Sequence, residues 1–250
     1  MTFLKAALAV VAVTVLSAHV APSVDDNNRY LKVTPLRDGF RLAYTVFFGE
    51  IPGASERRNL DGNRDGRIDE AEAKRFADKL GAEVADALTL DTNGAAQRVR
   101  WSQVTPGMGS DAVAAGSFSI DLVTFVCTGP GPRHHIRIRD QFRIPKPGET
   151  EVKVEDSPGV TIQRARVGAA DDPSHDFRFV GPGGPLSDDG LELDYTTSDK
   201  TPAMPAGACT AASPARGSST SRWPIVLAAL AALALAAGGF VLLRRRARAS

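Results

Sequence analysis

The twelve residues DGNRDGRIDEAE, numbered 61–72, carry the most specific pattern in the chain. Short oxygen-bearing side chains stand at every second position at the start of this stretch: Asp61, Asn63 and Asp65. With Asp69 and Glu72 they bring four carboxylates into a short segment, and like charges so close repel each other unless a cation neutralises them. An all-oxygen donor set of this size fits a hard divalent cation, and it favours Ca²⁺ over Mg²⁺.

The same stretch matches the twelve-residue EF-hand loop position by position. Gly66 stands at the sixth position, where a sharp turn favours φ > 0, Ile68 is the apolar eighth residue, and Glu72 is the twelfth. A plain solvated turn is the alternative, because Asp, Asn and Gly favour turns for local reasons, but a turn requires neither Ile68 nor Glu72. The pattern predicts a Ca²⁺ site, with Arg67 contributing only its backbone carbonyl, made by Asp61, Asn63, Asp65, Arg67, Asp69 and Glu72.

Around the loop, two kinds of hydrophobic periodicity predict the secondary structure. Residues 40–48 alternate with a period of two, as a half-buried strand does, and 30–36 precede them across a turn. Residues 53–59 and 69–88 are the expected helices on either side of the loop, the second with an apolar stripe. Further strands are expected at 88–91, 97–104, 117–127, 135–144, 151–155 and 160–167. The prediction for 19–170 is an α+β fold, an antiparallel β-sandwich-like domain with an inserted EF-hand helix-loop-helix.

The two ends of the chain predict a membrane-anchored protein. Residues 1–18 are typical of a signal peptide. Residues 224–243 are uncharged and mostly apolar, long enough for a transmembrane helix, and a basic tail follows at 244–250. By the positive-inside rule the tail is cytoplasmic, so that the bulk of the chain is extracytoplasmic, in the periplasm or at the cell surface. Residues 171–222, rich in Pro, Gly and Ser, predict a disordered stalk with one strand-like run at 191–195.

Charge and motif content exclude several function classes. The chain has 30 basic and 29 acidic residues; removing Lys5 and the four arginines of the tail leaves 25 − 29 = −4 for the remainder. A mildly acidic ectodomain argues against nucleic acid as a partner. There is no serine elbow, Gly-rich phosphate loop or HExxH motif, so no enzyme is predicted. The state of Cys127 and Cys209 stays open, although the predicted compartment permits a disulfide.

Three segments of the chain resemble the extracytoplasmic N-terminal segment of bacterial nickel/cobalt exporters. They are HVAPSVDDNNRYLKV, the run from RLAYTVFFGEIPGASERRNLDGNRDG through to ALTL, and IRIRDQFRI. The resemblance covers roughly residues 19–145. Those exporters also have a bundle of membrane helices, which this sequence lacks. The resemblance therefore implies a binding or sensing domain without transport.

Two functions follow from the sequence. The first is a membrane-anchored Ca²⁺-binding protein with a mainly structural or interaction role. Its affinity would be weak, with Kd about 10⁻⁴ to 10⁻³ M, because only one loop is visible and no second loop stands ready to rigidify it. The second is an accessory protein that binds or senses nickel, cobalt or copper beside a metal transporter. It rests on the resemblance and on His19 as a metal ligand. If the signal peptide is cleaved after Ala18, His19 becomes the N-terminus; if it is cleaved after Ala21, His19 is removed. A scaffold whose loop is vestigial is the third alternative; the surface partner stays open in each case.

Overall fold

Long strands with alternating burial build the first of two β-sheets. The computed structural model describes residues 25–209. β1 (Asn27–Leu36) and β2 (Gly39–Phe48) form a hairpin in which every second residue of β2, from Phe40 to Phe48, is buried. The sheet order is β11-β8-β1-β2-β6-β5, and all neighbours are antiparallel except β1 and β8. The other four strands of this sheet are β5 (Gln103–Gly107), β6 (Phe118–Cys127), β8 (Pro147–Val154) and β11 (Asp176–Val180).

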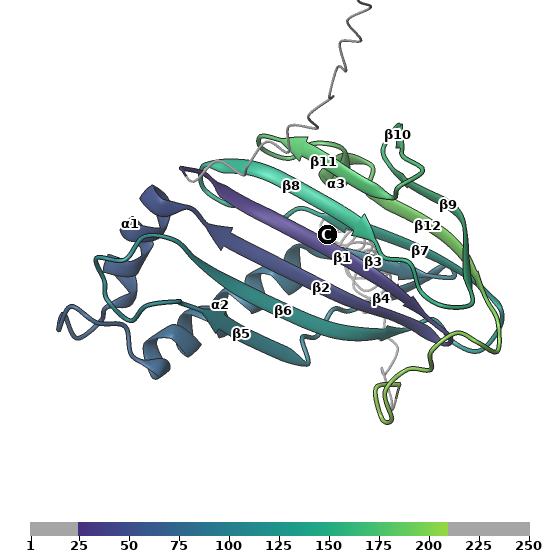
Figure 1. Ribbon diagram of the computed structural model, residues 1–250, viewed down its shortest axis with the longest axis horizontal. Coiled ribbons are helices and arrows are strands. Elements are labelled where there is room, and N and C mark those ends of the chain that lie inside the picture. The colour runs from purple at the N-terminus through teal and green to yellow at the C-terminus, as the bar shows by residue number, and fades with distance from the viewer. Residues whose placement is uncertain (1–24, 210–250) are drawn as a thin grey trace, which may run out of the picture. The chain divides into compact units, whose positions relative to one another are not determined.

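The second sheet is antiparallel throughout, with the order β10-β9-β12-β7-β3-β4. One of its central strands, β12 (Leu191–Thr197), comes last in the sequence but lies in the sheet between two strands that precede it, β9 and β7. It buries Leu191, Leu193 and Tyr195. The sheet's other strands are β3 (Leu88–Thr92), β4 (Ala95–Gln97), β7 (Arg133–Asp140), β9 (Val160–Val167) and β10 (Ala170–Asp171). Figure 1 shows β9, β12 and β7 as neighbours, in the order given by their hydrogen bonds.

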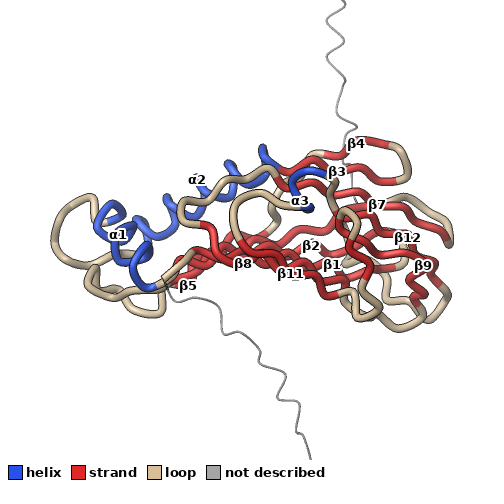
Figure 2. The backbone as a smooth tube through the Cα atoms, turned by 90° about the horizontal axis from the view of Figure 1, so that it is seen from above, coloured by secondary structure: helices blue, strands red, loops and turns tan. Residues whose placement is uncertain are grey.

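Three helices complete the described residues: α1 (Glu50–Leu60), α2 (Glu70–Ala87) and the short α3 (Pro185–Asp188). One face of the first sheet is covered by the second sheet toward one end and by α1 and α2 toward the other (Figure 2). α2 buries Ala77, Leu80 and Val84 against the core. Gly81 lets α2 approach closely, because a Cβ there would lie 3.3 Å from the Leu122 side chain.

A buried polar network joins the two sheets through the core. Arg29 on β1 and Asp140 on β7 form an ion pair of 3.0 Å, with side chains 4% and 0% exposed. The Tyr44 hydroxyl on β2 donates to the same Asp140 oxygen at 2.7 Å. Burial raises the pKa of Asp140, and the charge of Arg29 lowers it. A charge removed from water in this way needs its partner, so this network requires both sheets to be in place.

The disulfide Cys127–Cys209 fastens the end of the described chain to the end of β6. The two Cα atoms are 5.6 Å apart across a sequence separation of 82 residues. The sequence left this pairing open, because nothing local predicts that residue 209 returns to β6.

The predicted fold class is wrong. Strands hold 45% and helices 18% of the described residues, in two sheets, so the fold is mainly β and not α+β. The expected EF-hand helix-loop-helix is also wrong. α1 and α2 flank the loop, but α1 is fastened by Arg57 to residues 108–117 and α2 packs on β5 and β3. The parallel pair of β1 and β8 departs from a purely antiparallel sandwich.

The expected disordered stalk is wrong for residues 171–209, because β11, α3 and β12 lie there and complete both sheets. Only the strand-like run at 191–195 was foreseen, and it is confirmed as part of β12. The single strand expected at 97–104 is wrong too, since β4 ends at Gln97 and β5 begins at Gln103.

No helix among residues 25–209 is long and apolar enough to cross a membrane. The predicted signal peptide 1–18, transmembrane helix 224–243 and basic tail 244–250 lie outside the described residues, as does the remainder of the predicted stalk. These assignments stay predictions.

Candidate metal centre

The predicted metal loop runs from the end of α1 to the first turn of α2 and winds around its own side-chain oxygens. Asp61 accepts hydrogen bonds from the backbone N–H groups of Asp65 at 3.1 Å and Gly66 at 3.0 Å. Gly66 has φ of 82°, as expected from its place in the pattern, and Arg64 has φ of 61°. The left-handed backbone at these two residues turns the chain back toward Asp61. The sharp turn predicted at Gly66 is therefore confirmed.

Glu72 closes the loop from the other side. Its side chain is buried, and its two oxygens accept from the N–H of Gly62 at 2.9 Å and of Asp69 at 3.1 Å. Asp69 in turn accepts from the N–H of Glu72 at 2.7 Å, which completes a capping box at the start of α2. One glutamate thus joins both ends of the loop and caps the helix.

The side chains of the six predicted ligands fall into separate hydrogen-bonded groups. Asp61, Asn63 and Asp65 are linked by hydrogen bonds to each other's backbone or side chains. Asp69 and Glu72 form the capping box. The Arg67 side chain points away to an ion pair with Asp111, which leaves its backbone carbonyl as the expected donor.

The oxygen atoms of the loop that would ligate a metal ion are chemically suited to calcium, although they accept hydrogen bonds from backbone amides. Within residues 25–209, no three His, Cys, Asp or Glu side chains are gathered closely enough to hold a metal ion as they stand. The loop carboxylates accept from backbone N–H groups instead. An ionised carboxylate has about four lone-pair sites, so Asp61, which accepts two hydrogen bonds, keeps acceptor capacity for a cation. Every donor is oxygen, as Ca²⁺ requires.

A segment of the same chain pairs with the loop, and the sequence did not predict this. Ile68 N–H donates to the Asp111 carbonyl at 2.7 Å, and Val113 N–H donates to the Gly66 carbonyl at 3.1 Å. An antiparallel bridge joins Arg67 and Ala112 between these two bonds. Ile68 is buried in a small apolar cluster with Leu60 and Ala73, against which Met108 and Val113 pack. The loop is thus held by the segment 108–113, which is not a second EF-hand loop.

Arg57 on α1 anchors that partner segment. Its side chain is 0% exposed, and its guanidinium lies 5.4 Å from the centroid of the Phe118 ring. Among the described residues the guanidinium donates only to backbone carbonyls, namely those of Met108, Ser110, Ala112, Gly116 and Ser117. Burial lowers the pKa of Arg57, and nearby Glu50 raises it. No local signal distinguishes this arginine from its solvated neighbour Arg58.

The histidines form no second metal group among the described residues. His134 is buried, with Nδ1 2.8 Å from the Thr128 hydroxyl, whereas His135 faces outward with Nδ1 2.7 Å from Asp194. Neighbours on a strand point to opposite faces, so the two cannot share an ion. Burial lowers the pKa of His134. His19 lies outside the described residues.

The chain matches no model of a known protein family, and no curated protein matches its sequence. The chemistry of loop 61–72 therefore carries the functional argument.

Proposed function

We propose that the protein binds Ca²⁺ through loop 61–72 and that the ion has a mainly structural or interaction role. The observation that carries the proposal is the closed loop itself. Its side-chain oxygens already face the turn at Gly66, and Glu72 bonds to both of its ends. A divalent ion among these carboxylates removes their mutual repulsion, which is strongest when no cation is present.

In this proposal the side-chain oxygens of Asp61, Asn63 and Asp65 and the backbone carbonyl of Arg67 hold one side of the ion. Asp69 and Glu72 complete the donor set. The loop connects α1, α2 and the partner segment 108–113, so an ion there strengthens the contact among three parts of the chain. The partner segment limits the motion of the loop, which supports a Kd at the tighter end of the range of extracellular modules, on the order of 10⁻⁴ M.

The disulfide supports an extracytoplasmic location, because stable disulfides belong to oxidising compartments. Calcium concentrations outside cells are high enough to occupy a site of this affinity by mass action. Membrane anchoring through residues 224–243, with a surface protein or metal transporter as neighbour, is part of the proposal and rests on the sequence. The accessory nickel, cobalt or copper function rests on the family resemblance and on His19, and His19 lies outside the described residues.

Calorimetric titration of the full-length protein with Ca²⁺, followed by Ni²⁺, tests the proposal. We expect saturable one-site Ca²⁺ binding that Asp65→Ala abolishes. Asp65 is exposed and leaves the Asp69–Glu72 capping box intact, so its removal changes the site with little effect on the fold. Glu70→Ala is the matched control, because Glu70 is an exposed carboxylate in the same stretch but at no ligand position. Equal Ca²⁺ binding by Asp65→Ala, or a response to Ni²⁺ alone, contradicts the proposal.

A further inference from the structure

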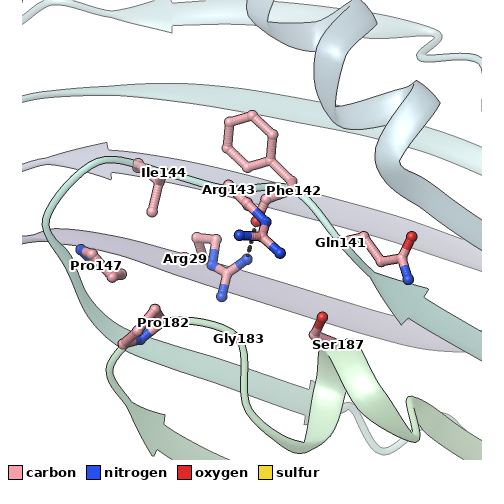
Figure 3. A pocket seen from close by; sticks show the side chains of 9 residues that line it. All are labelled: Arg29, Gln141, Phe142, Arg143, Ile144, Pro147, Pro182, Gly183 and Ser187. Atoms are coloured by element: carbon pink, nitrogen blue, oxygen red, sulfur yellow. Dashed lines mark hydrogen bonds between the residues drawn. The ribbon is translucent and has the colours of Figure 1, made fainter.

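A pocket of about 500 Å³ lies beside the buried ion pair of Arg29 and Asp140, away from the calcium loop. Its lining comes from β1, the connection from β7 to β8, the start of β8, the turn that leads into α3, and α3 itself (Figure 3). The volume falls within the roughly 300–1,000 Å³ typical of small-molecule sites. The lining residues are Arg29, Gln141, Phe142, Arg143, Ile144, Pro147, Pro182, Gly183 and Ser187.

Arg29 forms the floor of this pocket and carries a donor without an acceptor. Its side chain is 4% exposed. The Nη1 group donates to Asp140 and to the Phe142 carbonyl at 2.8 Å, and Nη2 donates to the Thr150 hydroxyl at 2.9 Å. The buried Nε–H has no hydrogen-bond partner among the described residues. That atom is shielded from solvent, so the donor that remains for a ligand is the second N–H of Nη2, whose first N–H is used by Thr150.

Arg143 supplies an unbalanced positive charge at the rim. It is exposed, and within residues 25–209 its guanidinium forms no ion pair. None of the lining residues carries a carboxylate, and Asp140 behind the floor is already shared with Arg29. The lining residues therefore carry a net charge of about +1 once Asp140 has offset Arg29, which favours a monoanion.

The remaining walls are apolar, with a few neutral polar groups. Phe142, Ile144, Pro147 and Pro182 offer ring and aliphatic surface, and Gln141 and Ser187 offer hydrogen-bonding groups. Mostly apolar walls with a small number of placed polar groups are the usual composition of small-molecule sites. A ligand that fits both the positively charged part and the apolar part of the pocket has one anionic oxygen group and an apolar body.

We propose that this pocket binds a small organic monocarboxylate, with its carboxylate at Arg143 and Arg29 and its apolar body against Pro147 and Pro182. Arginine matches a carboxylate by planar, two-point hydrogen bonding. A doubly charged phosphate fits less well, because the charge of Arg29 is already neutralised by Asp140. The site is independent of the calcium loop and of the function proposed for it.

Calorimetric titration of the full-length protein with sodium benzoate tests the proposal. We expect one saturable site with Kd on the order of 1 mM, as suits a probe of about nine non-hydrogen atoms. Benzamide, which keeps the ring and lacks the charge, and inorganic phosphate, which lacks the apolar body, should each bind at least about tenfold more weakly. Ser187→Tyr, which adds a ring to the α3 wall, should abolish benzoate binding.

The matched pair of variants is Arg143→Gln and Arg98→Gln. Arg98 is an exposed arginine outside the pocket. We expect Arg143→Gln to weaken benzoate binding about tenfold or more and Arg98→Gln to leave it unchanged. Neither arginine is buried, so neither substitution should unfold the protein. The proposal is overturned by the absence of saturable heat at roughly 20 mM benzoate, by equal binding of benzamide or phosphate, or by equal losses in the two variants.

Discussion

Calcium binding to loop 61–72 should slow hydrogen exchange at two backbone amides outside the ligand set. Ile68 N–H and Val113 N–H hold the loop to the partner segment, at 2.7 Å and 3.1 Å from their acceptors. Both bonds must break for the loop to separate from residues 108–113. An ion that binds only the closed loop therefore stabilises both bonds together.

The expected size follows from mass action. With free Ca²⁺ at about 100 times Kd, the closed loop gains about 2.7 kcal/mol. Each 1.4 kcal/mol is about a tenfold change in an equilibrium constant, so local opening becomes roughly 100-fold rarer. Exchange at Ile68 and Val113 should slow by about that factor, because amides that exchange through local opening report its free energy.

Hydrogen exchange followed by NMR, with about 10 mM Ca²⁺ or with a chelator, measures this effect when Kd is near 10⁻⁴ M. Asn93 N–H, in the turn between β3 and β4, donates to the His135 carbonyl at 2.9 Å; it is the internal control and should change little. Asp65→Ala should remove the calcium effect on both amides. If Ca²⁺ binds stoichiometrically while Ile68 and Val113 exchange at unchanged rates, the ion lies elsewhere and the reasoning fails.

Three further predictions concern stability. The pKa of Glu192 is lowered from 4.5 to about 2 by its hydrogen bonds with its two arginine partners and by their charges; that difference corresponds to at most about 3 kcal/mol, and roughly 1–2 kcal/mol remains because both arginines are about half exposed. An acid whose pKa is lowered in the folded state stabilises the fold above pH 4.5 and loses this contribution as pH falls toward 2. Urea unfolding should therefore show a lower free energy of unfolding for Glu192→Gln than for the wild type at pH 7, and a smaller difference at pH 3. A difference that does not change with pH contradicts this. Cys209→Ser opens a loop of 82 residues closed by Cys127 and should cost about 2–5 kcal/mol, with the reduced wild type melting at the same temperature as the variant; an unchanged melting temperature would show that the bond does not form. Asp140→Asn leaves Arg29 buried without a counter-charge and should cost about 3–5 kcal/mol in thermal unfolding, whereas a loss below about 1 kcal/mol would show that water reaches the pair.

The features that the sequence alone determined are local ones. Gly66 at the turn follows from residue chemistry over a few positions, because backbone conformation depends on near neighbours. The alternation along β2 was equally readable, since a strand with one buried face repeats every two residues. That His134 and His135 point to opposite faces follows from the same period.

The tertiary structure alone decided which distant segments meet. β12 lies between β7 and β9, residues 108–113 pair with loop 61–72, and Cys209 returns to Cys127, yet none of these pairings has a local signature. The same holds for Arg57 and Arg29, which any single sequence presents as ordinary surface charges until the backbone carbonyls and the Asp140 carboxylate surround them. Pairing across a sheet depends on which edges remain free when the chain folds, and that information is spread over the whole sequence. The sequence therefore identified the loop that we propose to bind calcium, whereas the fold revealed what holds that loop in place and the pocket beside Arg29.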